Sequence, residues 1–249
     1  LAGAIPHRHP GHRPCEKSGQ HAKALLTSDP VKAYLLFGIE PEYDCAYSAE
    51  AIKNLSDAEW VVCMSPYITE AMAEYADVVL PITPFSETQG TFVNNAGTWQ
   101  SFAPASEPMG DSKPGWKVLR VLAHFLHLKG YHYQTIQQVR MELEEELSEM
   151  PAYEAKAVEL GHLSLNTDQQ SFRLAPWPMY RTDNVVRRAK ALQETMNDEL
   201  AVISVNQTMA EQLGFLVGER VTASQGDSRI TLPLMIDNLL AVGVVLLAS

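Results

Sequence analysis

The residue types best suited to binding chemistry lie in the stretch DVVLPITPFSETQGTFVNNAGTWQSF, residues 77–102. Gly90 and Gly97 permit positive φ or a close approach of the backbone to a ligand. Thr91 and Asn94 offer hydroxyl and amide groups that both donate and accept hydrogen bonds. Such a loop could hold a phosphate-bearing cofactor, or its glycines and asparagines could simply build turns, which is their commonest use.

Motifs of covalent or metal-assisted catalysis do not occur in the sequence. It has no GxSxG elbow, HExxH helix, Walker loop or GxGxxG fingerprint. Ser86 and Glu87 have no visible base or orienting partner, so the residue pattern assigns neither of them a catalytic role. The sequence predicts no catalytic residue in this chain.

Histidines and cysteines are the other candidates for chemistry. His7, His9 and His12 stand close together and could bind a transition metal, but such sites recruit distant ligands too, and a loop of hydrated histidines is the alternative. His124 and His127 are three residues apart on a predicted helix and lack carboxylates at matching spacing, which favours plain helix surface. His132 lies beyond that helix.

The three cysteines, Cys15, Cys45 and Cys63, are far apart and form no CxxC pair. Structural zinc sites and iron–sulfur clusters need clustered thiolates. The sequence therefore predicts no metal site in this chain, and thiols that serve as core or surface side chains.

The bulk composition excludes several classes of protein. The net charge of −11 argues against a general nucleic-acid binder, and no uncharged apolar run is long enough to insert into a membrane. The chain begins at Leu1 and ends within a strand-like stretch, which predicts a fragment of a longer protein.

An α/β arrangement must position the 90–97 loop. Apolar runs at 31–38, 60–65 and 77–82 alternate with helical patterns at 48–55 and 66–76, which predicts a parallel, Rossmann-like sheet with flanking helices. The first thirty residues lack periodicity and are predicted to form a loop. Further helices are predicted at 111–130 and 135–151, and the candidate loop would lie at the carboxyl edge of the sheet.

The composition of the sequence changes from residue 151 onward. Residues 151–181 have a linker-like composition, a helical pattern follows at 182–196, and the rest is β-rich, with an Asn206-capped helix ending at Gly214 and a hairpin turning at Gly226-Asp227. The predicted organisation is an α/β domain at 1–150, a linker and helix at 151–197, and an incomplete β domain at 198–249.

The stretch ADVVLPITPFSETQGTFVNNAG resembles the signature of the molybdopterin oxidoreductase superfamily. Residues 206–227 resemble the dinucleotide-binding β-barrel at the C-terminus of the same superfamily, which implies a partial barrel for the last domain. The resemblance covers about 31–130 and 198–249. It implies that the candidate loop is a pterin loop, with the cofactor-binding positions Glu87, Gly90, Thr91, Asn94 and Gly97.

Within the superfamily, GAIPHR at 3–8, IEPEYD at 39–44 and TDNVVRRAKALQ at 182–193 are similar to the large iron–sulfur subunit of NADH-quinone oxidoreductase, which is respiratory complex I. Glu40 stands where cofactor-loaded members carry Asn in a G-x-N-P turn. Trp99 replaces a common Arg. Both departures imply that the loop is vestigial and that molybdopterin is absent.

This resemblance implies a cofactor-free scaffold inside an enzyme that transfers electrons from NADH to quinone and translocates protons. Iron–sulfur clusters would lie elsewhere in the full-length subunit. The partners would be other complex I subunits of the peripheral arm, on the cytoplasmic side of the bacterial inner membrane. The alternatives are a fragment of a true molybdopterin enzyme, similar to formate dehydrogenase or nitrate reductase, and a free-standing α/β binding protein.

Overall fold

The computed structural model describes residues 20–28, 31–94, 98–148, 171–195, 201–226 and 228–247. The chain divides into two compact units, residues 1–155 and 156–249, each of which is described by itself. The predictions on His7, His9, His12, Cys15 and Gly97 lie outside the described residues.

The first unit is built on a three-stranded parallel sheet in the order β1 (Ala33–Phe37), β2 (Trp60–Ser65), β3 (Val78–Pro81). Ala33 pairs with Trp60 and Val62 pairs with Val78, so the three strands run in register toward one carboxyl edge. The predicted parallel sheet is confirmed, because three short apolar runs separated by helices leave little alternative.

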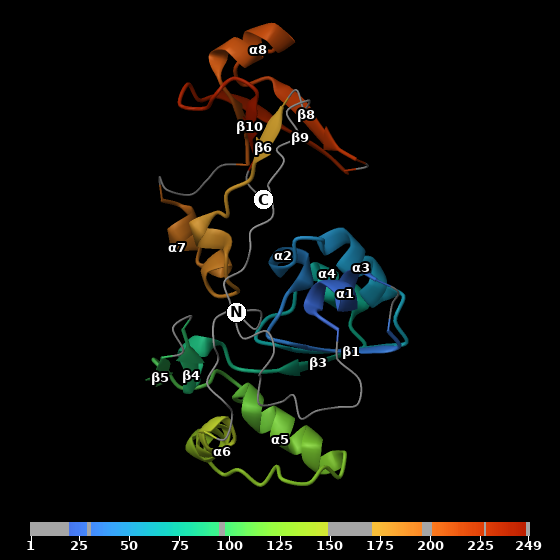
Figure 1. The fold of residues 1–249 in the computed structure, drawn as a ribbon, viewed down its shortest axis with the longest axis vertical. Coiled ribbons are helices and arrows are strands. Elements are labelled where there is room, and N and C mark those ends of the chain that lie inside the picture. Colours follow the sequence, from blue (N-terminus) through green and yellow to red (C-terminus); the bar gives the residue numbers. More distant parts are fainter. Residues whose placement is uncertain are drawn as a thin grey trace. The chain divides into compact units, whose positions relative to one another are not determined.

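Short helices cover one side of this sheet: α1 (Ala22–Thr27), α2 (Pro41–Asp44), α3 (Ser48–Ser56) and α4 (Glu70–Tyr75) (Figure 1). The prediction of a loop over the first thirty residues was wrong at α1, where the His21 side chain accepts a hydrogen bond from the Ala24 N–H and caps the helix. The helix predicted to begin at residue 66 begins instead at Glu70, because Thr69 caps it through the Met72 N–H.

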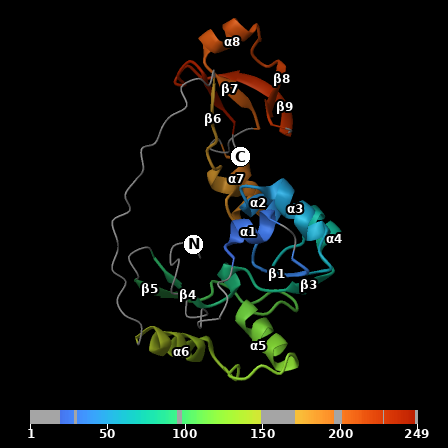
Figure 2. The same cartoon turned by 45° about the vertical axis from the view of Figure 1, so that its right-hand side comes forward.

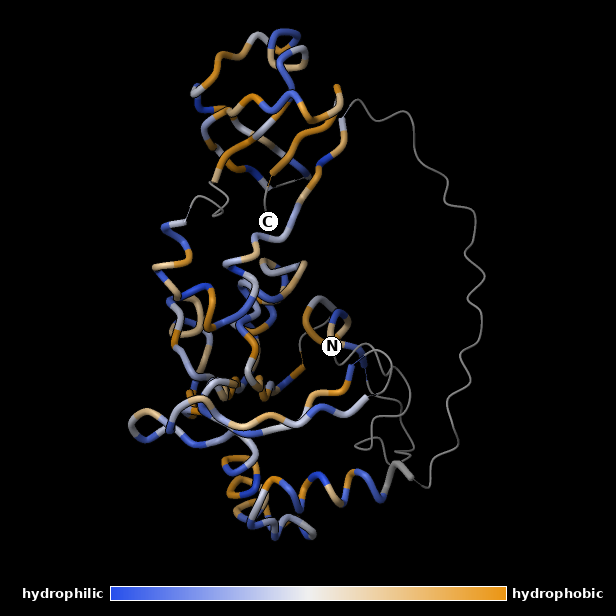
Figure 3. Tube along the Cα trace, turned by 90° about the vertical axis from the view of Figure 1, so that its left-hand side faces the viewer, coloured by the Kyte–Doolittle hydropathy of each residue, from blue (hydrophilic) through white to orange (hydrophobic). Residues whose placement is uncertain are grey.

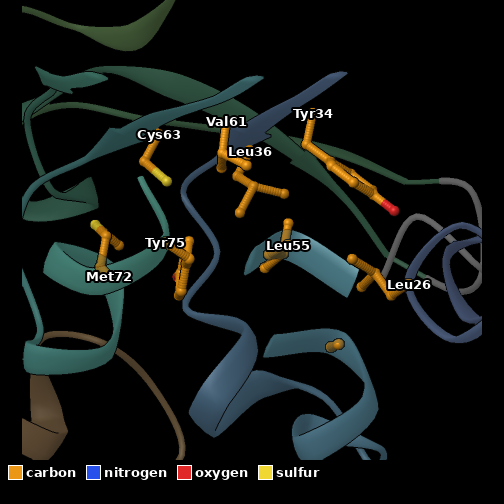
Figure 4. Packing of buried hydrophobic residues seen from close by; sticks show 9 residues of the cluster. Leu26, Tyr34, Leu36, Leu55, Val61, Cys63, Met72 and Tyr75 are labelled. Carbon is orange, nitrogen blue, oxygen red and sulfur yellow. The ribbon is translucent and has the colours of Figure 1, made fainter. Parts of the chain in front are cut away.

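The core of the first unit lies between this helical layer and the sheet (Figure 4). Alternate residues of β1 and β2 point into it, and Leu55, Met72 and Tyr75 come from α3 and α4 to meet them. The buried cluster is Leu26, Tyr34, Leu36, Ala51, Leu55, Val61, Cys63, Met72 and Tyr75. This packing fixes α3 and α4, and with them the loops at the carboxyl edge.

After β3 the chain forms η2 (Phe85–Glu87) and then an antiparallel hairpin of β4 (Gly90–Val93) and β5 (Trp99–Phe102). The 90–97 segment was predicted as an open loop, but most of its described residues are hairpin strand. The Phe92 and Phe102 rings stack with their centroids 4.9 Å apart. A Cβ at position 90 would lie 2.9 Å from the Phe102 ring, so Gly90 is required by packing within the hairpin.

Helix α5 (Gly115–Phe125) lies on the side of the sheet opposite α1, α3 and α4 (Figures 1 and 2). It is shorter than the predicted 111–130, because Lys113 bridges to Ile82 beyond the end of β3 and the Thr83 N–H donates to the Lys113 carbonyl at 3.0 Å. At the other end the helix stops before His127, whose φ is 55°. Helix α6 (Ile136–Ser148) follows, close to its prediction.

The second unit holds a five-stranded sheet in the order β6 (Phe172–Leu174), β10 (Val244–Leu246), β7 (Ile203–Val205), β9 (Ser228–Ile236), β8 (Arg220–Gln225). Its core is the buried cluster of Ile203, Val205, Ala210, Val221 and Leu234. Both hydrophobic and hydrophilic residues occur along its trace (Figure 3). Helix α8 (Gln207–Leu213) is confirmed: the Asn206 side chain accepts the Met209 N–H, and Gly214 ends the helix with φ of 74°. The β8–β9 hairpin is confirmed, with Gly226 at φ 58°.

In place of the single helix predicted at 182–196, the structure has η4 (Val186–Arg188) and α7 (Lys190–Gln193). A short turn of helix, η3 (Met179–Arg181), precedes them. Asp183 accepts the N–H groups of both Val185 and Val186, which closes a local turn there. Ala189, with ψ of 84°, then separates η4 from α7. Among the described residues of both units, no helix is long and apolar enough to cross a bilayer.

Candidate functional site

The carboxyl edge of the three-stranded sheet is where such sheets bind ligands, and the turn after β1 forms one side of it. Gly38, with φ of 64°, ends β1 and donates its N–H to the Met64 carbonyl at 2.8 Å. Pro41 starts α2, and the Asp44 carboxylate accepts the Glu40 N–H at 2.7 Å. Glu40 is only 1% exposed. The turn therefore buries a carboxyl group where the resemblance placed a neutral amide.

A second carboxyl group joins this turn to α4. Glu42 accepts hydrogen bonds from the Thr69 hydroxyl and, at 3.2 Å, from the Tyr75 hydroxyl. We call Glu42, Thr69 and Tyr75 the Glu42 network. Because Thr69 also caps α4, the network ties the start of that helix to α2.

The network and the core around it hold the neighbouring acidic groups in their protonated forms. Burial, and then the Glu42 charge, raise the pKa of Tyr75 far above its usual value. Burial and Glu42 likewise raise the pKa of Cys63 to about 11. Burial, Asp44 and Glu42 raise the pKa of Cys45. A thiol must lose its proton to act as a nucleophile, so these shifts lower the fraction of reactive thiolate at both cysteines.

The raised Cys63 pKa predicts a loss of stability in alkaline solution. A thiol with a folded-state pKa of about 11 and an ordinary value of 9.0 stabilises the fold fully below pH 9 and loses that contribution as the pH rises toward 11. We expect the free energy of unfolding in urea to fall less steeply over this range in Cys63→Ala than in the parent chain. Equal slopes from pH 9 to 11 would contradict the assignment.

The predicted pterin-loop residues are partly brought together by the hairpin. Thr91 Oγ1 lies 3.0 Å from Ser101 Oγ on the opposite strand. Asn94 Oδ1 accepts the Thr98 N–H at 2.9 Å. Glu87 lies apart from them in η2, where it accepts the Met109 N–H at 3.0 Å. Each of these polar side chains is already bonded within the protein.

A guanidinium group that sequence reasoning missed lies against the same hairpin. Arg140 of α6 stands 5.6 Å from the Trp99 ring centroid and donates to Ser101 Oγ. It also pairs with Glu144 at 2.7 Å. These contacts of Arg140 hold α6 against the hairpin. Only the i,i+4 spacing of Arg140 and Glu144 was visible in the sequence.

The side chains of this region do not fit an anionic pterin cofactor. Such a group needs donors and positive charge around its phosphate. Thr91 instead bonds to Ser101, and Asn94 to the Thr98 N–H, while Arg140 is paired with Glu144. The turn after β1 holds the acidic residues Glu40, Glu42 and Asp44. The Phe102 ring occupies the space next to Gly90.

No group of three or more His, Cys, Asp or Glu side chains in the described part of the chain is placed to hold a metal ion. His124 and His127, predicted as helix surface, are both exposed, and together with His132 they line a pocket beyond the end of α5.

Comparisons with known proteins place the first unit in context. Residues 12–125 match the family described as molybdopterin oxidoreductase. The match contains the three-stranded sheet, the hairpin and α5.

Two kinds of oxidoreductase are similar in sequence. One is a Staphylococcus aureus (strain USA300) protein provisionally named as a formate dehydrogenase, 43% identical over 68 residues, which are 27% of this chain and 7% of that protein. Another is the mitochondrial 78 kDa subunit of NADH-ubiquinone oxidoreductase from Candida albicans (strain SC5314), 38% identical over 73 residues, 29% of this chain and 10% of that one. The matched segments are thus a small part of these relatives.

Among solved structures, acetylene hydratase from Pelobacter acetylenicus has a similar fold. The TM-score is 0.61 with 19% sequence identity, over 91% of this chain and 38% of that one. At this identity the likeness concerns the fold alone. It supports the α/β assignment of the first unit and the curled sheet of the second.

Proposed function

We propose, from the premise that residues 12–125 form a molybdopterin oxidoreductase family domain, that this chain is part of the large iron–sulfur subunit of an NADH-quinone oxidoreductase. In that enzyme it serves as a cofactor-free scaffold, and the 90–97 segment is a vestigial pterin loop. Electrons pass from NADH to quinone, coupled to proton translocation, through clusters held outside this chain.

The observation that carries the proposal is the acidic turn after β1, at the carboxyl edge of the sheet. The Glu42 network fixes the turn after β1, and Glu40 is buried within that turn. A buried carboxyl group offers no positive charge to a phosphate group at this edge. The similarity to the 78 kDa subunit of an NADH-ubiquinone oxidoreductase supports the same assignment.

We expect the purified full-length protein to contain iron but no molybdenum or tungsten above background. Mass spectrometry of the metals and fluorescence of the oxidised pterin measure this directly. A molybdopterin enzyme expressed in the same cells serves as the control that cofactor is supplied. Stoichiometric molybdenum or tungsten in the protein would contradict the scaffold proposal.

The second candidate is a fragment of a true molybdopterin-dependent oxidoreductase, similar to formate dehydrogenase or nitrate reductase. It is favoured by the 43% identity to the Staphylococcus aureus protein provisionally named as a formate dehydrogenase. The same metal measurement separates it from the scaffold.

The partners and location follow from the first proposal. Other subunits of the peripheral arm would contact this chain, on the cytoplasmic side of the bacterial inner membrane. Co-purification of NADH:quinone activity with an affinity-tagged full-length protein, from detergent-solubilised membranes, tests both.

A further inference from the structure

The segment from residue 112 to 141 has a charge pattern unlike the rest of the chain. Although the whole chain has a net charge of −11, no acidic residue occurs between Asp111 and Glu142. The ionisable side chains of this segment are Lys113, Lys117, Arg120, His124, His127, Lys129, Tyr131, His132, Tyr133 and Arg140. A local excess of positive charge on an acidic protein attracts anions.

Part of this segment forms a pocket of about 250 Å³ beyond the end of α5. Its lining consists of His124, His127, Leu128, Lys129, Tyr131 and His132. The lining thus contains three imidazoles, an ammonium group and a phenol, and no carboxylate. A small anion in this pocket would therefore meet several hydrogen-bond donors.

Hydrogen bonds of the surrounding chain hold the walls of this pocket. The His127 N–H donates to the His124 carbonyl at 3.0 Å, and the Leu128 N–H donates to the Ala123 carbonyl at 2.9 Å. These bonds, with the positive φ of His127, turn the chain back after α5. Arg120, farther back on α5, donates to the Tyr133 carbonyl at 2.6 Å, which ties the segment after His132 to the helix.

We propose that this pocket is a site for a doubly charged oxyanion, a phosphate or sulfate group, held by the side chains of His124, His127, His132 and Lys129. The proposal is independent of the function proposed above. The acidic side chain that contacts this loop, Glu142 of α6, is bonded to the Tyr133 hydroxyl at 2.8 Å.

A metal ion is a poorer occupant than an anion. Three histidines are a common set of transition-metal ligands. In the described part of the chain, however, these side chains are not grouped closely enough to hold a metal. Lys129 in the lining would also repel a cation.

Titration with sodium sulfate, followed by NMR of the histidine ring signals of the whole chain, tests the proposal. Ionic strength is held constant with chloride. We expect saturable shifts of the His124, His127 and His132 signals.

Matched variants make the result specific. Lys129→Gln and His127→Gln should each weaken sulfate binding by about tenfold, because each removes a charged donor. His21→Asn is the control, since His21 lies on α1 and asparagine keeps its capping role. Its affinity should equal that of the parent chain.

Phenyl phosphate as a second probe distinguishes the source of the anion. Affinity equal to that of sulfate indicates a free oxyanion, and tighter binding indicates a phosphate ester whose organic group contacts Tyr131. Unsaturable shifts that are equal at all histidines, or affinity that is unchanged by Lys129→Gln, would overturn the proposal.

Discussion

Replacement of Leu55 by alanine is expected to lower the free energy of unfolding of the first unit by about 2–5 kcal/mol. Leu55 is 1% exposed on α3 and packs among the buried residues of β1, β2 and α4. The change removes buried methyl groups and leaves a cavity that the surrounding strands fill only in part. Urea denaturation followed by circular dichroism, with hydrogen exchange to isolate the first unit, measures the loss.

Leu35→Ala is the matched control for Leu55→Ala. Leu35 lies on β1 but is 49% exposed on the other face of the sheet. Its replacement should cost less than about 1 kcal/mol. If the two variants lost equal stability, the core would not lie between the sheet and α3.

Replacement of Glu42 by alanine is expected to cost roughly 2–4 kcal/mol, because two partly buried hydroxyl groups lose their acceptor. These are the hydroxyls of Thr69 and Tyr75. Glu42→Gln should cost less, since an amide oxygen still accepts. It should also bring the pKa of Tyr75 down, which ultraviolet titration of the phenol measures.

Glu50→Ala is the control for the Glu42 variants, because Glu50 is an exposed acidic residue on α3. Only a small change is expected there. If Glu42→Gln left the titration of Tyr75 where it is in the parent chain, the Glu42 network would not exist in solution.

The parallel sheet of the first unit could be predicted because the alternation of apolar runs and helical patterns along the sequence indicates it. Three apolar runs with helical patterns between them admit only a parallel arrangement. The limits of the helices depended on contacts that the sequence does not display. Residues preceding α5 are held extended by Ile82, and Thr69 rather than Pro66 caps α4.

The candidate site was harder to predict, for the same physical reason. The residue types of the 90–97 segment suit both a ligand cradle and a hairpin, and cross-strand partners decide between them. Gly90 is needed because Phe102 packs on it, and Thr91 meets Ser101. The Glu42 network joins residues from α2 and α4 that only the folded chain brings together.

The close contact between α5 and β1 should be detectable as covariation between two sequence positions. A Cβ at position 115 would lie 2.4 Å from the Phe37 ring. Any side chain at 115 therefore requires the ring to shift, or a smaller side chain at position 37. Gly115 and Phe37 belong to elements far apart in the chain. Across related sequences these two positions should therefore covary, with glycine at 115 wherever an aromatic ring stands at 37, and a larger residue at 115 only where 37 has become small.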